Sequence, residues 1–126
     1  MPNKFKAIVI EDEPSLSGAI KKKLSGADVH AEVTKSGREA IDMIKRNQQY
    51  SGIWLDFDIL DFDGLEFMKQ FTKLPKDLQC PVLIVSNTGD PGHIKQAIAL
   101  GAKKWIVKAE ARLDDTVEEF IKIISG

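Results

Sequence analysis

The chain has 126 residues, the length of one ordinary globular domain. Hydrophobic residues make up 43% and charged residues 29%. This composition excludes a disordered chain, and the hydrophobic residues are enough for one sizeable core. The 18 Lys and Arg against 19 Asp and Glu give a net charge of −1, which argues against direct nucleic-acid binding and against a polybasic membrane anchor. The single cysteine excludes an internal disulfide framework, and the first apolar run stops at three acids, so neither a signal peptide nor a membrane span is predicted. We expect a cytoplasmic protein.

Short apolar stretches alternate with helical patterns along the chain. In chain order, strands are predicted at 5–10, 29–34, 52–55 (ending at Asp56), 81–85 and 105–107. Helices are predicted between them at 14–26, from Ser36 through Ile44, from Gly64 through Phe71, and between Asp90 and Gly101 with Ile94, Ala97 and Ile98 on one face. A last helix carries Val117, Phe120, Ile121 and Ile124. Local signals support the helix starts: Pro14 suits a first helical turn, and Ser36 with Glu39 forms a capping box.

Alternating strands and helices at these spacings predict an α/β fold, a parallel sheet covered by helices on both faces. Most strands are apolar throughout, as in a sheet buried on both faces, whereas residues 29–34 alternate apolar and polar side chains, as in an edge strand. No repeat or linker interrupts the pattern, so we expect a single domain over residues 1–126. Ligands of such sheets bind beyond the carboxyl ends of the strands.

Polar side chains follow four of the predicted strands where each strand ends. Glu11 and Asp12 follow the first strand, Asp56 the third, Ser86 the fourth and Lys108 the fifth. Three crowded carboxylates repel one another, and a hard divalent cation such as Mg²⁺ relieves that repulsion. Because a hydroxyl and an ammonium group face the same place, an anion could sit beside the metal. The set predicts a phosphoryl site with a carboxylate as nucleophile.

Over nearly its whole length the chain resembles the receiver domain of two-component response regulators. The resemblance rests on Ile8 to Pro14, on Trp54-Leu55-Asp56 through Asp63-Gly64-Leu65-Glu66, on Pro81 to Ser86, and on Gly101-Ala102 through Lys108. It implies a CheY-like, flavodoxin-like doubly wound fold of five parallel strands in the order 2-1-3-4-5. It also implies a phosphoacceptor signalling domain rather than a turnover enzyme.

By this resemblance, Asp56 is the residue phosphorylated by a histidine kinase or phosphotransfer protein. The resemblance further implies that Asp12 binds Mg²⁺ directly, that Glu11 does so through water, and that Asp56 and the backbone carbonyl of Asp58 complete the protein ligands. The domain would catalyse its own phosphorylation and dephosphorylation.

The resemblance assigns the remaining positions to switching. Ser86 would hydrogen-bond the phosphoryl group, Lys108 would pair with it, and Trp105 matches the aromatic position whose rotamer reports activation. The surface of the fourth helix, fifth strand and fifth helix would bind a downstream protein. Because no effector domain follows in this sequence, we expect a stand-alone receiver.

The sequence departs from the family pattern at four positions. Leu60 stands where Pro is usual, Asn87 replaces a small residue, Asp58 adds a negative side chain, and Ala109 replaces the Pro that usually follows the lysine in a cis bond. None of them removes a chemical group from the site. We expect Asp58 and Asn87, with the neighbouring Thr88, to tune reaction rates.

Two other functions fit part of the pattern. Asp56-Phe57-Asp58 after an apolar strand resembles the first motif of haloacid-dehalogenase-like phosphatases, in which Asp58 would be a general acid/base. Against a phosphatase, the threonine expected in that motif is missing, and two β-α units precede it. A receiver-like interaction module that is never phosphorylated is the second alternative, and the complete set of acids, hydroxyl and lysine argues against it.

Overall fold

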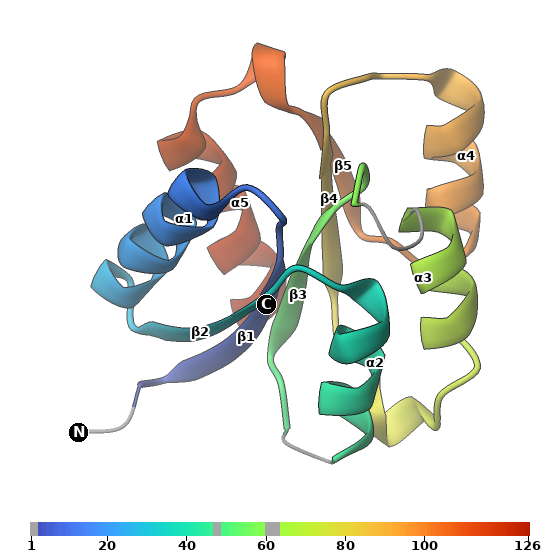
Figure 1. The fold of residues 1–126 in the computed structure, drawn as a ribbon, viewed down its shortest axis with the longest axis horizontal. Coiled ribbons are helices and arrows are strands. Elements are labelled where there is room, and N and C mark those ends of the chain that lie inside the picture. Colours follow the sequence, from blue (N-terminus) through green and yellow to red (C-terminus); the bar gives the residue numbers. More distant parts are fainter. Residues whose placement is uncertain (1–2, 47–48, 60–63) are drawn as a thin grey trace.

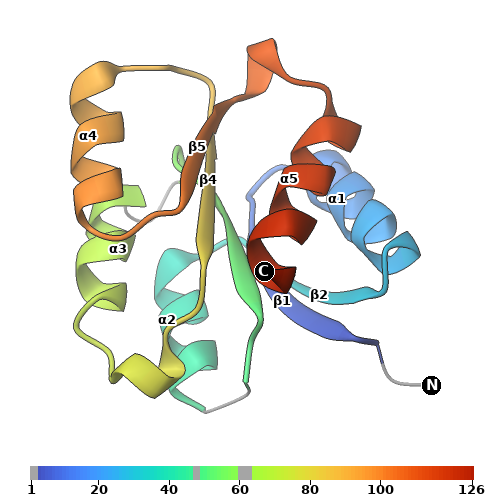
Figure 2. The same ribbon diagram turned by 180° about the vertical axis from the view of Figure 1, so that it is seen from behind.

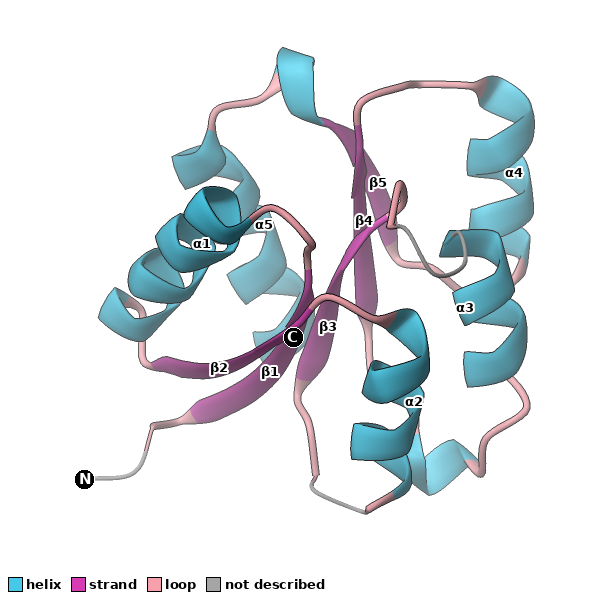
Figure 3. Ribbon diagram, viewed as in Figure 1, coloured by secondary structure: helices cyan, strands magenta, loops and turns pink. Residues whose placement is uncertain are grey.

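In the computed structural model, which describes residues 3–46, 49–59 and 64–126, one parallel sheet forms the centre of the molecule (Figures 1 and 3). Its strand order is β2-β1-β3-β4-β5, as the family resemblance implied. The strands are β1 (Phe5–Ile10), β2 (Val29–Thr34), β3 (Gly52–Asp56), β4 (Val82–Ser86) and β5 (Lys104–Val107). The helices are α1 (Pro14–Gly26), α2 (Gly37–Lys45), α3 (Gly64–Phe71), α4 (Pro91–Ala99) and α5 (Leu113–Ser125), with short 3₁₀ turns η1 (Lys76–Leu78) and η2 (Lys108–Glu110).

The helices cover both faces of the sheet, which confirms the predicted doubly wound α/β fold. Helices α1 and α5 lie on one face and α2, α3 and α4 on the other, as the front and back views show (Figures 1 and 2). Each face has its own apolar cluster. Trp54 of β3 packs against Phe120 on the α1–α5 side, whereas Ile53 and Leu55 point to the other side among Phe67, Met68 and Phe71. This arrangement follows from the two-residue period of a strand.

Local sequence signals set most of the helix ends. Pro14 occupies the first turn of α1, the Ser36 hydroxyl accepts from the Glu39 backbone N–H at 3.1 Å, and the Asp90 carboxylate caps Gly92 at 2.9 Å. Gly101 follows α4 with φ of +107°, a conformation that glycine adopts most easily. Helix α1 ends at Gly26, as predicted, and the residue with a left-handed backbone after it is Asp28 (φ 66°).

Two predictions about burial are corrected. Ile98 does not share a buried face with Ala97: its side chain is 44% exposed, and Ala97 is the buried residue of α4. In β2, Thr34 is buried and Val33 is only partly buried, because β2 is an edge strand whose end turns into the α2 capping loop, where the Thr34 hydroxyl accepts from the Ser36 N–H. Strand β4 also begins one residue later than predicted, and β5 one residue earlier.

The fold places the predicted functional residues at the carboxyl edge of the sheet. Strands β1, β3 and β4 are neighbours, so residues that directly follow them meet at one edge. Leu60 lies outside the described residues, as do Asp61 and Asp63. None of the helices in the described part of the chain is long and apolar enough to cross a membrane.

Candidate functional site

An acidic cluster forms where β1 and β3 end. Carboxylate oxygens of Glu11, Asp12 and Asp56 all lie within 4.8 Å of one another. Glu11 is only 2% exposed and Asp56 only 3%. The backbone holds both in place: the Glu11 N–H donates to Thr34 O at 3.0 Å, and the Phe57 N–H donates to Val85 O at 2.9 Å, which extends the ladder past Asp56. The prediction that these three acids meet is confirmed.

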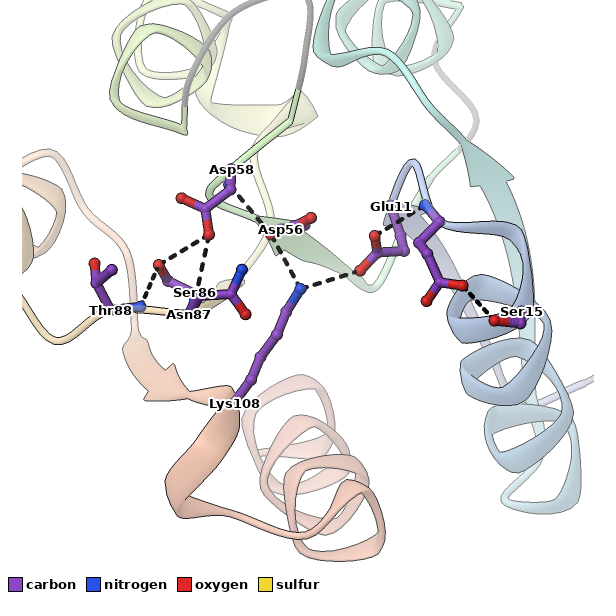
Figure 4. Close-up of polar contacts among 9 residues, drawn as sticks. Glu11, Ser15, Asp56, Asp58, Ser86, Asn87, Thr88 and Lys108 are labelled. Atoms are coloured by element: carbon purple, nitrogen blue, oxygen red, sulfur yellow. Dashed lines mark hydrogen bonds and ion pairs between the residues drawn. The ribbon is translucent and has the colours of Figure 1, made fainter.

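Lys108 supplies the positive charge of this cluster. It begins η2 directly after β5, and its Nζ reaches 3.4 Å from Asp56 Oδ1 and 3.5 Å from Glu11 Oε1 (Figure 4). The side chain therefore bridges two buried carboxylates from two different strands. In the described residues every peptide bond is trans, including the Lys108–Ala109 bond that the family pattern left open.

Burial disfavours the negative charge on Glu11 in this cluster. Desolvation, followed by repulsion from Asp56, raises the pKa of Glu11 to about 7, although the Glu13 N–H and Lys108 act in the opposite direction. Glu11 Oε2 accepts from the Glu13 N–H at 3.1 Å, but the buried Oε1 accepts no hydrogen bond. A donor set made only of oxygens, one of them buried without a hydrogen bond and paired, among the described residues, only with Lys108 at 3.5 Å, is suited to a hard divalent cation. The residues present thus fit the predicted Mg²⁺ site.

Asp58 does more than add charge near the site. Its Oδ2 accepts hydrogen bonds from Ser86 Oγ and from the Asn87 backbone N–H, both at 3.2 Å, while its own N–H donates to Asp56 Oδ1 at 3.2 Å (Figure 4). The sequence predicted Asp58 beside the acceptor but not this bridge from β3 to β4, because side-chain direction in a loop has no periodic signal.

Ser86 is connected to Trp105 through Thr88. The Thr88 N–H donates to Ser86 Oγ at 3.2 Å, and Trp105 Nε1 donates to the Thr88 carbonyl at 3.0 Å. The Trp105 ring also packs on Phe57, with ring centroids 4.7 Å apart. Sequence reasoning missed Phe57, although an aromatic residue directly after Asp56 was a signal for such packing. Ser86, Thr88 and Trp105 thus form one hydrogen-bonded chain from β4 to β5.

The comparison with protein families agrees with this geometry. The family model of the response regulator receiver domain matches residues 7–118.

This chain belongs to the receiver domain family.

Curated relatives of the receiver domain include chemotaxis proteins. A CheY homolog of Campylobacter jejuni is 26% identical over 82% of this chain and 81% of its own length. CheY of Listeria monocytogenes is 28% identical over 82% of this chain and 86% of its own length. Both are relatives of similar size, so the similarity covers most of each chain.

Solved structures share the fold. The Francisella response regulator 1452 receiver domain matches with a TM-score of 0.83 and 20% identity, over 97% of this chain and 98% of that one. The beryllofluoride-activated receiver domain of Klebsiella pneumoniae RstA matches with a TM-score of 0.82 and 18% identity, over 96% and 99%. The receiver match includes most of β1 and all of α1, β2 and α2, the two β-α units that the phosphatase alternative left unexplained. The chain is therefore a signalling domain of the two-component type, a family that takes phosphoryl groups and generally binds Mg²⁺ at an acidic pocket.

Proposed function

We propose that Asp56 is the phosphoacceptor of this receiver domain, which spans residues 1–126. The observation that carries the proposal is the Asp56 carboxylate itself: it is buried, it lies in the acidic cluster, and its Oδ1 faces Lys108 Nζ at 3.4 Å. The donor would be a histidine kinase or phosphotransfer protein, and acetyl phosphate would serve as a small-molecule substitute.

The transfer uses a carboxylate oxygen of Asp56 as the nucleophile. As this oxygen bonds to phosphorus, the bond from phosphorus to the donor's histidine nitrogen breaks and its electron pair stays on the imidazole. Lys108 pairs with the Asp56 carboxylate at rest and would offset the negative charge of the phosphoryl oxygens during the transfer. Water later attacks the same phosphorus, the bond from phosphorus to the Asp56 oxygen breaks, and inorganic phosphate leaves the restored carboxylate, so the domain catalyses both steps on itself.

The acidic cluster would hold Mg²⁺ through Asp12 and Asp56, through Glu11 by way of water, and through the backbone carbonyl of Asp58. When bound, Mg²⁺ would neutralise part of the charge of the carboxylates and of the phosphoryl oxygens. Two observations support this assignment: Glu11 Oε1 accepts no hydrogen bond beside its ion pair with Lys108, and the carboxylate oxygens cluster within 4.8 Å.

The signal would leave through Ser86 and Trp105. The hydrogen-bonded chain Ser86–Thr88–Trp105 supports this route, because it links the site to β5. The surface of α4, β5 and α5 would then bind a downstream protein in the cytoplasm, without direct contact to nucleic acid or membrane. Asp58, Asn87 and Thr88 would set the rates of phosphorylation and dephosphorylation.

Intact-mass measurement after incubation with acetyl phosphate and Mg²⁺ tests the proposal. We expect one phosphoryl adduct in the wild-type chain and none in Asp56→Asn, whose amide is a poor nucleophile. An adduct that persists in Asp56→Asn would contradict the assignment of the acceptor. Absence of any adduct in the wild type, with a phosphorylated kinase as well as with acetyl phosphate, would favour the interaction module that is never phosphorylated. Steady turnover of phosphate esters would favour the phosphatase instead.

A further inference from the structure

The Asp58 carboxylate is held across the site although Asp58 is an exposed residue. One oxygen, Oδ2, accepts from a hydroxyl and from a backbone N–H that belong to the end of β4, 28 and 29 residues away along the chain. An exposed aspartate gains most of its hydrogen bonds from water, so two protein donors converging on one oxygen mark a position where the fold receives an anion. Ser86, one of these donors, is fully buried.

A phosphoryl group on Asp56 would meet the same two donors. Asp58 is two residues after Asp56, and its N–H donates to Asp56 Oδ1 at 3.2 Å, so the acceptor and the bridging carboxylate are adjacent. Phosphoryl oxygens and carboxylate oxygens carry negative charge and accept from the same kinds of donor. Ser86 Oγ has one proton to donate, so it cannot serve the Asp58 oxygen and a phosphoryl oxygen at once.

We propose that the Asp58 carboxylate is an internal substitute for a phosphoryl oxygen, which occupies the Ser86 and Asn87 donors until phosphorylation of Asp56 displaces it. This inference rests on the proposed role of Asp56. Only hydrogen bonds are exchanged: the Asp58 carboxylate leaves to solvent, and a phosphoryl oxygen accepts in its place. Asp58 is thus a residue that sets how readily the site accepts a phosphoryl group.

Two consequences follow for the unphosphorylated domain. The bond to Asp58 Oδ2 fixes Ser86, which in turn accepts from Thr88, so the chain toward Trp105 is engaged before any phosphoryl group arrives. Occupied donors also reduce the apparent affinity for a phosphoryl group, because only the fraction of molecules with the carboxylate displaced can bind it fully.

Comparison of Asp58→Ala with Asp58→Asn separates this occupancy from simple charge repulsion. Both variants remove the negative charge, but the asparagine carbonyl can still accept from Ser86 and Asn87, whereas alanine offers no acceptor. The measurement is a titration with beryllofluoride, a phosphoryl analogue, in the presence of Mg²⁺, and ¹H–¹⁵N correlation spectra of each variant would report binding. We expect the dissociation constant to fall roughly tenfold in Asp58→Ala and roughly threefold in Asp58→Asn. Equal dissociation constants for the two variants would show that charge alone acts and would overturn the proposal.

Two further variants complete the design. Glu13→Gln removes an exposed acid whose side-chain partner is Ser15 and which touches neither donor, so we expect the dissociation constant to stay within about twofold of the wild type. In a Ser86→Ala background, the gain from Asp58→Ala should shrink, because the two oxygens then compete for one donor instead of two. An undiminished gain would contradict a shared hydroxyl donor.

The same spectra test the resting state without any ligand. In Asp58→Ala, the Asn87 amide proton should move upfield, since it loses a charged acceptor, while amides of α1 stay in place and report an intact fold. An unmoved Asn87 resonance would overturn the proposal whether or not Asp56 is the acceptor. Failure of the wild type to bind beryllofluoride, with the Asn87 shift as expected, would instead contradict the proposed function.

Discussion

Lys108 Nζ lies 3.4 Å from Asp56 Oδ1 and 3.5 Å from Glu11 Oε1, so one ammonium group bridges the ends of β3 and β1. The charges remain unbalanced even so, because Asp12 adds a third carboxylate to the cluster. A bound cation or a proton on one of the carboxylates would relieve this imbalance.

Mg²⁺ should stabilise the fold. A ligand that binds only the folded state adds RT ln(1 + [L]/Kd), which is about 1.4 kcal/mol at a concentration ten times Kd. Thermal unfolding of the wild type should therefore shift upward in millimolar Mg²⁺, and Asp12→Ala, which lacks one carboxylate of the cluster, should lose most of the shift. If Mg²⁺ left the melting temperature of the wild type unchanged but raised that of Asp12→Ala, the assignment of the Mg²⁺ site to the acidic cluster would be wrong.

Without metal, the free energy of unfolding should depend on the protonation of Glu11. The pKa of Glu11 in the folded protein is about 7, above the ordinary 4.5, chiefly because of burial. Between these values the folded state binds more protons than the unfolded state, so the contribution of Glu11 to stability is fully present below about pH 4.5 and is lost as pH rises through about 7.

Glu11→Gln should remove this pH dependence, because glutamine does not titrate. In EDTA, the free energy of unfolding of Glu11→Gln minus that of the wild type should increase by up to about 3 kcal/mol as the pH rises from 5 to 8. Urea unfolding at several pH values measures the difference, and Glu13→Gln is the control with an exposed acid nearby. Parallel pH profiles for Glu11→Gln and wild type would refute the raised pKa.

Phosphorylation by acetyl phosphate should be faster in Asp58→Asn. The wild-type carboxylate repels an anionic donor that approaches the neighbouring Asp56, and exposed charges act most strongly at low ionic strength. We expect a rate increase of roughly threefold at low salt, which shrinks as salt is added. The rate of adduct formation by mass spectrometry is the measurement. Equal or slower labelling of the variant at low salt would count against the repulsion.

The phosphoryl analogue should change the fluorescence of Trp105. Exchange of the Asp58 oxygen for an analogue fluorine moves Ser86, and the Thr88 carbonyl, which accepts from the indole, moves with it. We measure emission in a Trp54→Phe background, which removes the buried second indole. Ser86→Ala should abolish most of the change while beryllofluoride still binds Asp56. If the emission change survives without the hydroxyl, the coupling does not run through Ser86.

The sequence by itself determined the order of strands and helices and the residues at the carboxyl edge of the sheet. Short apolar runs, a proline at a helix start and the Ser36–Glu39 capping box act over a few residues, so they can be recognised in the sequence alone. In a parallel sheet the strand ends share one edge, and the meeting of Glu11, Asp12, Asp56 and Lys108 followed from that rule together with the strand order that the family resemblance implies.

Only the tertiary structure decided where side chains turn once the strands have ended. The hydrogen bond from Ser86 to Asp58 and the contact of Trp105 with Phe57 join segments that are distant in the chain. Ile98 is exposed because no distant segment in the described part of the chain packs over it. Gly64 is a further case: a Cβ there would lie 2.5 Å from the ring of Phe57. Loop side chains have no periodicity, and their direction depends on which donors and which packing partners another strand presents.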